Sequence, residues 1–249
     1  LTAGSTLLSS YTEDSPTSKH ADAIDNGITP VDVDDTNIEG ATVTIASSYD
    51  SGKDVLAFAS SFSSSTLTGS FNATTGVFTL SGSDTVANYQ AALRAVTYAN
   101  TSDHPTAGSR KVSFVISDGD LSSNTTEVTL TVTAVNDAPI IVSGGAMTYT
   151  ENDAATVIHS TLTVSDYEGD GLTGATVQIT GNYSNSEDVL AFATLGAISG
   201  TWNATDGTLT LSGSGTVAEY QAALRTVTYV NSSDNPTTLD RTLSFTVTE

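Results

Sequence analysis

The sequence predicts an all-β protein made of two tandem Ig-like or cadherin-like β-sandwich domains, each with one short helical turn. Long segments recur along the chain, and apolar residues recur mainly with a period of two, with Gly or Asn-Asp between the alternating stretches. Alternation with frequent turn residues is typical of sandwich strands. A length of 249 residues corresponds to two domains at about 100–150 residues each, so each copy can bury its own core.

The repeat defines the domain organisation. Asp54-Val-Leu-Ala-Phe58 recurs 134 residues later as Asp188-Val-Leu-Ala-Phe192, whereas Thr85-Val-Ala-Asn-Tyr-Gln-Ala-Ala-Leu-Arg94 recurs 131 residues later. A three-residue deletion in the second copy, near the counterpart of residues 60–66, accounts for the change of offset. We therefore predict one domain over residues 1–134 and a second over 135–249. The second copy ends at the counterpart of Asp118 and has no counterpart of the last strand of the first, so we expect the sequence to be an excerpt of a longer chain, with a strand supplied by another chain as the alternative.

The strands of the first copy are predicted from alternation and turn residues. Residues 110–117 and 126–133 alternate most regularly and are expected to bury Val112, Phe114, Ile116, Val128, Leu130 and Val132. In chain order, the predicted strands are Ser5 to Tyr11, Ile24 to Val31, Ala41 to Ala46, a pair formed by Val55 to Ala59 and Thr66 to Phe71, Gly76 to Leu80, Arg110 to Ser117 and Thr126 to Thr133.

One stretch of each copy departs from the period of two. Residues 85–93 place Val86, Tyr89 and Leu93 at spacings of three and four behind Ser, Asp and Thr, which are good N-cap residues. Residues 216–224 repeat the pattern. We expect a short helix in each copy that covers an open edge of the core.

Charge and cysteine content exclude several function classes. The chain carries 28 Asp and Glu against 7 Lys and Arg, a formal net charge of -21. Nucleic acid and anionic membrane surfaces both require a basic face, so neither is an expected partner. No cysteine is present, which excludes disulfides and zinc-thiolate sites. No apolar run of about 18 residues is present, so no membrane insertion is expected.

Several motifs resemble a known class of repeat. Ser117-Asp-Gly119, then a strand, then Val135-Asn-Asp-Ala-Pro139 is similar to the boundary between cadherin-like repeats and between the related chondroitin-sulfate-proteoglycan-type repeats of large bacterial surface proteins and adhesins. Residues 89–103 resemble the middle of such repeats. The resemblance implies spacer or adhesive repeats of an extracellular or cell-surface protein. Its expected partners are neighbouring repeats of the same chain, copies of itself, or cell-surface glycans or proteins.

The acidic residues predict calcium sites at the ends of these domains. Ca²⁺ takes 6–8 oxygen ligands, largely carboxylates and carbonyls. In a sandwich with strands of alternating direction, loops from both copies would face the hinge Ala134-Val-Asn-Asp-Ala-Pro-Ile140 and rigidify it through bound Ca²⁺. The candidate ligands at this joint are Glu13, Asp103, Asn136, Asp137, Asp166, Glu168, Asp170 and Glu249. An N-terminal half-site of the first copy would comprise Asp32, Asp34, Asp35, Asp118 and Asp120. The alternative is a solvated acidic linker with Asx turns.

No catalytic constellation is found, and we predict no enzymatic activity. His104 is replaced by Asn235 in the second copy, His20 and His159 fall in poorly matching stretches, and no serine lies in a Gly-x-Ser-x-Gly elbow. Two other functions stay open. The chain would be a filament subunit assembled by strand donation if another chain supplied the missing last strand. It would be a carbohydrate-binding module if Tyr49, Tyr167 and Tyr183 presented exposed coplanar rings.

Overall fold

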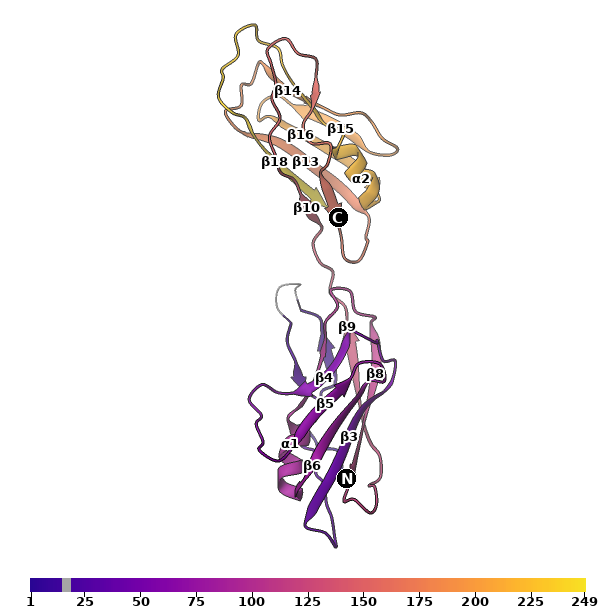
Figure 1. The fold of residues 1–249 in the computed structure, drawn as a ribbon. Helices are drawn as coiled ribbons and strands as arrows, with labels where there is room; N and C mark the ends of the chain where they lie inside the picture. Colours follow the sequence, from indigo (N-terminus) through magenta and orange to yellow (C-terminus); the bar gives the residue numbers. More distant parts are fainter. Residues whose placement is uncertain (15–18) are drawn as a thin grey trace. The chain divides into compact units, whose positions relative to one another are not determined.

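The computed structural model describes residues 1–14 and 19–249. The chain divides into two units, Leu1–Val135 (unit 1) and Asn136–Glu249 (unit 2). Each unit has its own core of buried apolar side chains. Each also contains one helix, labelled α1 and α2 in Figure 1. The predicted all-β class, with two β-domains that each contain one short helix, is confirmed.

Unit 1 is a sandwich of a six-stranded and a three-stranded sheet. The order of the larger sheet is β1-β9-β8-β3-β6-β5, and that of the smaller is β2-β7-β4. The elements are β1 (Ser10–Thr12), β2 (Asp22–Ala23), β3 (Asn37–Ser47), β4 (Asp54–Phe58), β5 (Thr68–Asn72), β6 (Val77–Thr85), α1 (Val86–Arg94), β7 (Val96–Asn100), β8 (Gly108–Ser117) and β9 (Thr126–Thr133).

The core of unit 1 follows from the period of two. Alternate residues of a strand point to the same face of the sheet, so β3, β8 and β9 each turn one apolar row toward the small sheet. Val112, Phe114 and Ile116 on β8 and Val128, Leu130 and Val132 on β9 are all buried, as predicted. β9 pairs antiparallel with β8 and parallel with β1, so that Tyr11 lies opposite Val132.

Unit 2 repeats this plan with fewer strands. Its sheets are β15-β16-β13-β18, β11-β17-β14 and the short pair β10-β12. The elements are β10 (Ile140–Val142), β11 (Thr156–Val157), β12 (Thr163–Ser165), β13 (Leu172–Gly181), β14 (Asp188–Ala191), β15 (Ser199–Asn203), β16 (Thr208–Gly215), α2 (Val217–Leu224), β17 (Thr228–Asn231) and β18 (Thr242–Thr248).

The two helices begin where their caps predict. The hydroxyl of Thr85 accepts a hydrogen bond from the backbone N–H of Asn88, and that of Thr216 accepts one from Glu219. Tyr89 and Leu93 are fully buried on α1, so the helix faces the core as expected. No helix in the described part of the chain is long and apolar enough to cross a membrane.

Three strand predictions for the first copy are wrong in part. The first strand is confined to β1, and Leu7 makes only an isolated bridge to Asp25. Residues 24–31 form no strand although Ile24 and Ile28 are buried, because Asp25 bends the loop by accepting the backbone N–H groups of Gly4 and Gly27.

The predicted pairing of residues 55–59 with 66–71 is also wrong. Both segments are strands, but β4 pairs with β7 and β5 pairs with β6, so they belong to opposite sheets. The Ser-rich segment between them therefore crosses from one sheet to the other instead of closing a hairpin.

Candidate functional site

The loops before β3 and after β8 bring acidic side chains together at one end of unit 1. The Oδ1 atom of Asp32 accepts the backbone N–H groups of Asp34 and Asp35 at 3.2 and 2.9 Å. That of Asp118 accepts those of Asp120 and Leu121 at 2.9 and 2.7 Å. These are Asx turns. Asp32 and Asp118 also line one small cavity of about 110 Å³.

We call the five aspartates at this end the acidic end cluster (Asp32, Asp34, Asp35, Asp118 and Asp120), because the other four lie near enough to Asp35 to act on its charge. Loss of solvent contact and the surrounding charges of the other four carboxylates raise the pKa of Asp35. Close carboxylates disfavour one another's charged forms, and a bound cation would relieve that repulsion. The structure therefore gathers all the residues predicted for the N-terminal half-site.

Glu13 and Asp103, predicted for the joint, meet at the end of unit 1 around a lysine. The Nζ atom of Lys19 lies 2.6 Å from Oδ1 of Asp103 and 4.0 Å from Oε1 of Glu13. Glu13 is also buried and accepts the backbone N–H of Val135 at 3.1 Å. An ammonium group thus occupies the position between two carboxylates at which the sequence predicts a calcium ion.

The remaining joint residues all belong to unit 2. The amide of Asn136 donates to Oε2 of Glu249, and the backbone N–H of Asp137 donates to Oε2 of Glu168 at 3.3 Å. Residues at the start of unit 2 are therefore tied to the loop after β12 and to the end of β18. The structure brings Asn136 together with Glu249, and Asp137 together with Glu168.

Asp166 and Asp170 complete this group. Oδ1 of Asp166 accepts the N–H groups of Gly169 and Asp170 at 2.7 and 3.1 Å. The hydrogen bond from Asn136 lowers the pKa of Glu249, but burial and the nearby carboxylates of Asp166 and Asp170 outweigh it, so that the net pKa is raised. In residues 1–14 and 19–249, no three His, Asp or Glu side chains are already arranged to enclose a metal ion. Metal binding would require these loops to reorient their carboxylates.

A buried carboxylate in each unit was not predicted as a polar site. Asp54, at the start of β4, is fully buried and accepts hydrogen bonds from the Tyr98 hydroxyl and the Asn100 amide, both at 2.6 Å. It also accepts the backbone N–H of Asp50 at 2.8 Å and faces Nε of Arg110 at 3.1 Å. The network links β4 and β7 of the small sheet to β8 of the large sheet.

Unit 2 repeats this network around Asp188. Tyr229 and Asn231 donate to its Oδ1 at 2.6 Å, and Nε of Arg241 lies 3.2 Å from its Oδ2. Burial raises the pKa of Asp188, but these hydrogen bonds outweigh burial and hold the pKa below its usual range. Burial and the bond to Asp188 raise the pKa of Tyr229 to about 12. Recurrence of Asp, Tyr, Asn and Arg at the repeat offsets was the sequence signal for this network.

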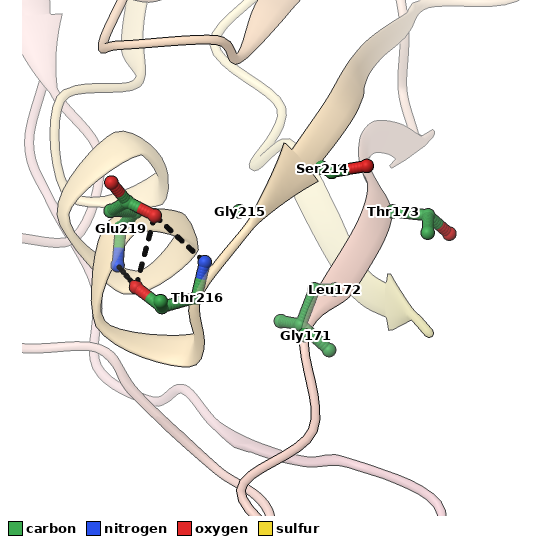
Figure 2. Close-up of a pocket in the computed structure, with 7 residues that line it drawn as sticks. All are labelled: Gly171, Leu172, Thr173, Ser214, Gly215, Thr216 and Glu219. Carbon is green, nitrogen blue, oxygen red and sulfur yellow. Dashed lines mark hydrogen bonds between the residues drawn. The ribbon is translucent and has the colours of Figure 1, made fainter.

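One hollow in unit 2 lies between the start of β13 and the start of α2 and has a volume of about 400 Å³. Figure 2 shows the residues that line it. Its only ionisable side chain is Glu219. The Glu219 carboxylate accepts the N–H and hydroxyl of Thr216 at 2.8 and 3.0 Å, bonds that lower its pKa. These bonds form a capping box, in which the Glu219 carboxylate caps the N-terminus of α2. The hollow therefore presents no acid and base pair for catalysis.

Two of the three tyrosines considered for carbohydrate binding are held against a neighbouring turn: Tyr49 against the turn between β5 and β6, and Tyr183 against the turn between β15 and β16. The Tyr49 and Tyr183 hydroxyls each donate to a backbone carbonyl at 2.6 Å. Their rings meet Phe71 and Trp202 edge to face, with interplanar angles of 82° and 80°. Tyr167 is exposed, but no ring stacks beside it among the described aromatic contacts. These rings do not form the coplanar platform that sugar binding requires.

Comparisons with known proteins give one distant sequence relative. No family model matches the chain. It is 27% identical, over 299 aligned positions, to halomucin of Haloquadratum walsbyi (strain DSM 16790 / HBSQ001). The alignment covers 79% of this chain and 3% of the halomucin chain, so the chain spans only a small part of that relative's length.

Among solved structures, the chain aligns with the Streptococcus agalactiae AgI/II polypeptide BspA C terminal domain (WT) at 13% identity. That alignment covers 84% of this chain and 80% of the other, with a TM-score of 0.23. A second structure, BspA_C_WT, aligns at 14% identity over the same shares, also with a TM-score of 0.23. TM-scores this low do not indicate a common fold.

Proposed function

We propose that this chain is a pair of non-enzymatic structural or adhesive spacer repeats of an extracellular surface protein, in which Ca²⁺ bound by the end loops rigidifies the joint between repeats. The observation that carries the proposal is the tandem duplication of one sandwich whose buried carboxylates, Asp54 and Asp188, are committed to internal bonds. The carboxylates that cluster and are available to a ligand are then those of the end loops.

The distant likeness to halomucin supports the extracellular location. A chain that aligns with 3% of a much longer protein is suited to be one segment of a long repeated architecture. In such repeat proteins each unit contacts its neighbours, and the array acts as a spacer. The net charge of -21 keeps such a segment soluble and disfavours anionic partners.

Calcium is proposed from the chemistry of the clustered groups. The acidic end cluster of unit 1 offers five carboxylates, and unit 2 offers those of Asp166, Glu168 and Glu249, all of them oxygen donors that Ca²⁺ prefers. Desolvation, followed by repulsion from neighbouring carboxylates, raises the pKa values of Asp35 and Glu249, and a divalent cation would remove the repulsion. Around Glu13 and Asp103, Ca²⁺ must displace Lys19, so we expect weaker binding there.

The test is thermal unfolding with 10 mM Ca²⁺, with 10 mM Mg²⁺ and with chelator. For a dissociation constant of about 0.5 mM, within the range of extracellular calcium modules, binding stabilises a unit by about 1.8 kcal/mol. For a unit of this size the melting temperature rises by about 6 °C. Asp118→Asn should reduce the calcium-dependent rise in the melting temperature of unit 1. Glu127→Gln is a matched control, because Glu127 lies on β9 and pairs with Lys111 at 3.1 Å.

Small-angle X-ray scattering under the same conditions tests the joint itself. Calcium should increase the maximum dimension of the chain and narrow the distribution of its dimensions. Lys19→Met should lower the calcium concentration at which this change occurs. Equal responses to Ca²⁺ and Mg²⁺, or a scattering response to calcium unchanged by Asp166→Asn, would refute a specific calcium site at the joint. The acidic loops would then be solvated turns.

A further inference from the structure

Six Asn-x-Ser/Thr sequences, in which x is not proline, match the acceptor pattern for N-linked glycosylation. These acceptor sequences begin at Asn72, Asn100, Asn124, Asn182, Asn203 and Asn231. In an N-linked glycan the sugar is attached to the side-chain amide nitrogen, Nδ2, of the asparagine. A folded chain can therefore carry a glycan only where this nitrogen reaches solvent, and the structure divides the six asparagines by that criterion.

Two of the acceptor sequences are closed, because their asparagines belong to the buried networks of the two units. Asn100 and Asn231 are 2% and 5% exposed. Nδ2 of Asn100 donates to Asp54, and Nδ2 of Asn231 donates to Asp188, both at 2.6 Å. A glycan on either nitrogen would need room inside the sandwich and would disturb the hydrogen bond to a buried carboxylate.

Two further asparagines are exposed, but their amide nitrogens are already bonded to the backbone. Nδ2 of Asn124 donates to the carbonyl oxygen of Leu1 at 3.0 Å. Nδ2 of Asn182 donates to the carbonyl oxygen of Asp240 at 2.7 Å. A sugar on either nitrogen competes with this bond for the same amide group.

Asn72 and Asn203 are exposed and keep their amide nitrogens available. They are the last residues of β5 and β15, each of which lies at one end of the strand order of its sheet. The Oδ1 atom of each accepts the backbone N–H two residues later, that of Thr74 or Thr205, at 2.9 Å. Among the hydrogen bonds described for residues 1–14 and 19–249, none uses Nδ2 of Asn72 or Asn203.

A tyrosine fixes the conformation of each of these two acceptor sequences. The Tyr49 hydroxyl donates to the carbonyl oxygen of Ala73, and the Tyr183 hydroxyl donates to that of Ala204, both at 2.6 Å. Each alanine is the middle residue of its acceptor sequence, and the threonine that completes the sequence is exposed. The two units therefore present the same three residues at the same turn, in the same hydrogen-bonded conformation.

We propose that Asn72 and Asn203 carry N-linked glycans, one at the equivalent turn of each unit. The donor is a lipid pyrophosphate-linked oligosaccharide. Nδ2 forms a C–N bond to C1 of the first sugar, and the bond between C1 and the pyrophosphate oxygen breaks. The pyrophosphate leaves with the bonding electron pair, and the amide releases one proton. The proposal uses the extracellular location proposed above, because such transfer acts on exported chains, and it does not depend on calcium.

The first experiment is transfer of the oligosaccharide to the whole folded chain by a purified oligosaccharyltransferase. Peptide mass mapping measures the glycan at each asparagine over time. One synthetic peptide for each of the six acceptor sequences measures the enzyme's own preference without the fold. The rate in the chain divided by the rate in the peptide should be at least about tenfold lower for Asn100 and Asn231 than for Asn72 and Asn203, because exposure of the buried amides breaks a hydrogen bond to a charged group.

Thr74→Ala and Thr205→Ala are the matched variants. Each removes the hydroxyl that the acceptor pattern requires and keeps the backbone N–H to which the asparagine oxygen is bonded. Each should abolish the glycan at its own site, leave the other site unchanged, and leave the melting temperature of the unmodified chain unchanged.

Peptide mapping of the chain isolated from its source tests occupancy in the cell, where glycan is expected at both sites. Absence of glycan from Asn72 or Asn203, in the transfer assay or in the chain from its source, would overturn the proposal. An equal or higher ratio of chain rate to peptide rate at any of the other four asparagines would also overturn it, because availability of Nδ2 in the folded chain would then not select the site.

Discussion

Replacement of Asp54 by alanine should destabilise unit 1 selectively. The carboxylate receives four groups: the Tyr98 hydroxyl, the Asn100 amide, the Asp50 backbone N–H and the Arg110 guanidinium, at 2.6, 2.6, 2.8 and 3.1 Å. Arg110 is 1% exposed, so its charge would lose its partner without gaining water. Removal of one member of a buried pair costs about 3–5 kcal/mol.

This cost converts to a large shift in melting temperature. A unit of 135 residues has an unfolding entropy of about 0.28 kcal/mol per degree, so the transition of unit 1 should fall by roughly 11–18 °C. Asp54→Ala combined with Arg110→Met removes both charges and should recover at least half of the loss, because a buried pair is often replaceable by apolar groups.

The assay exploits the single tryptophan of the chain. Trp202 packs against the core of unit 2, so its fluorescence follows that unit alone, whereas far-UV circular dichroism follows both. Asp54→Ala should lower the first dichroism transition and leave the fluorescence midpoint unchanged. Asp188→Ala should lower the fluorescence midpoint by less, because Arg241 lies nearer to solvent. A shift of less than about 3 °C for Asp54→Ala, or equal shifts of both signals, would refute the reasoning.

Two further predictions concern backbone strain and pH. Gly82→Ala should destabilise unit 1 by at least about 1–3 kcal/mol, because Gly82 has φ +124° and its Cβ would lie 2.2 Å from the carbonyl oxygen of Thr66. Gly108→Ala is the control, because Gly108 has φ +135° but no atom lies within 4 Å of its Cβ position, so this variant carries the backbone strain without the steric clash. The same denaturation assay measures both variants. An equal loss of unfolding free energy at both sites would contradict a contribution from the clash. The hydrogen bond to Asp14 raises the pKa of His20, so its contribution to stability is complete below pH of about 6.5 and is lost as pH rises through the folded-state pKa. His20→Gln should flatten this dependence, and an imidazole NMR titration at the usual pKa would contradict it.

Much of the fold could be predicted because its determinants are local. The alternating apolar residues of β8 and β9 and the threonine caps of α1 and α2 lie within single elements, so the period of two and the cap chemistry identify them. The loop at residues 24–31 was misassigned because Asp25 fixes it through the N–H of Gly4, a contact across 21 residues that no local pattern encodes.

The candidate site was predictable to a similar extent. The clustering of Asp32 with Asp118, and of Glu13 with Asp103, follows from the alternating direction of the strands. The ion pair of Lys19 with Asp103 was missed because the lysine lies after an insertion that has no counterpart in the second copy. The role of Asp54 was missed because a charged residue beside a strand is normally read as exposed, and only its partners reveal it as buried.

The parallel pairing of β1 with β9 determines how unit 1 carries a pulling force. β1 is the first strand of the larger sheet along the chain and β9 is the last, and these two strands are hydrogen-bonded to each other side by side in the same direction. Tension applied along the chain therefore loads the bonds from Ser10 to Thr12 in shear, so that they must break together instead of opening one after another like a zipper. Glu13 extends the contact by donating its N–H to Thr133 at 3.0 Å. The terminal strands of unit 1 thus act as a mechanical clamp.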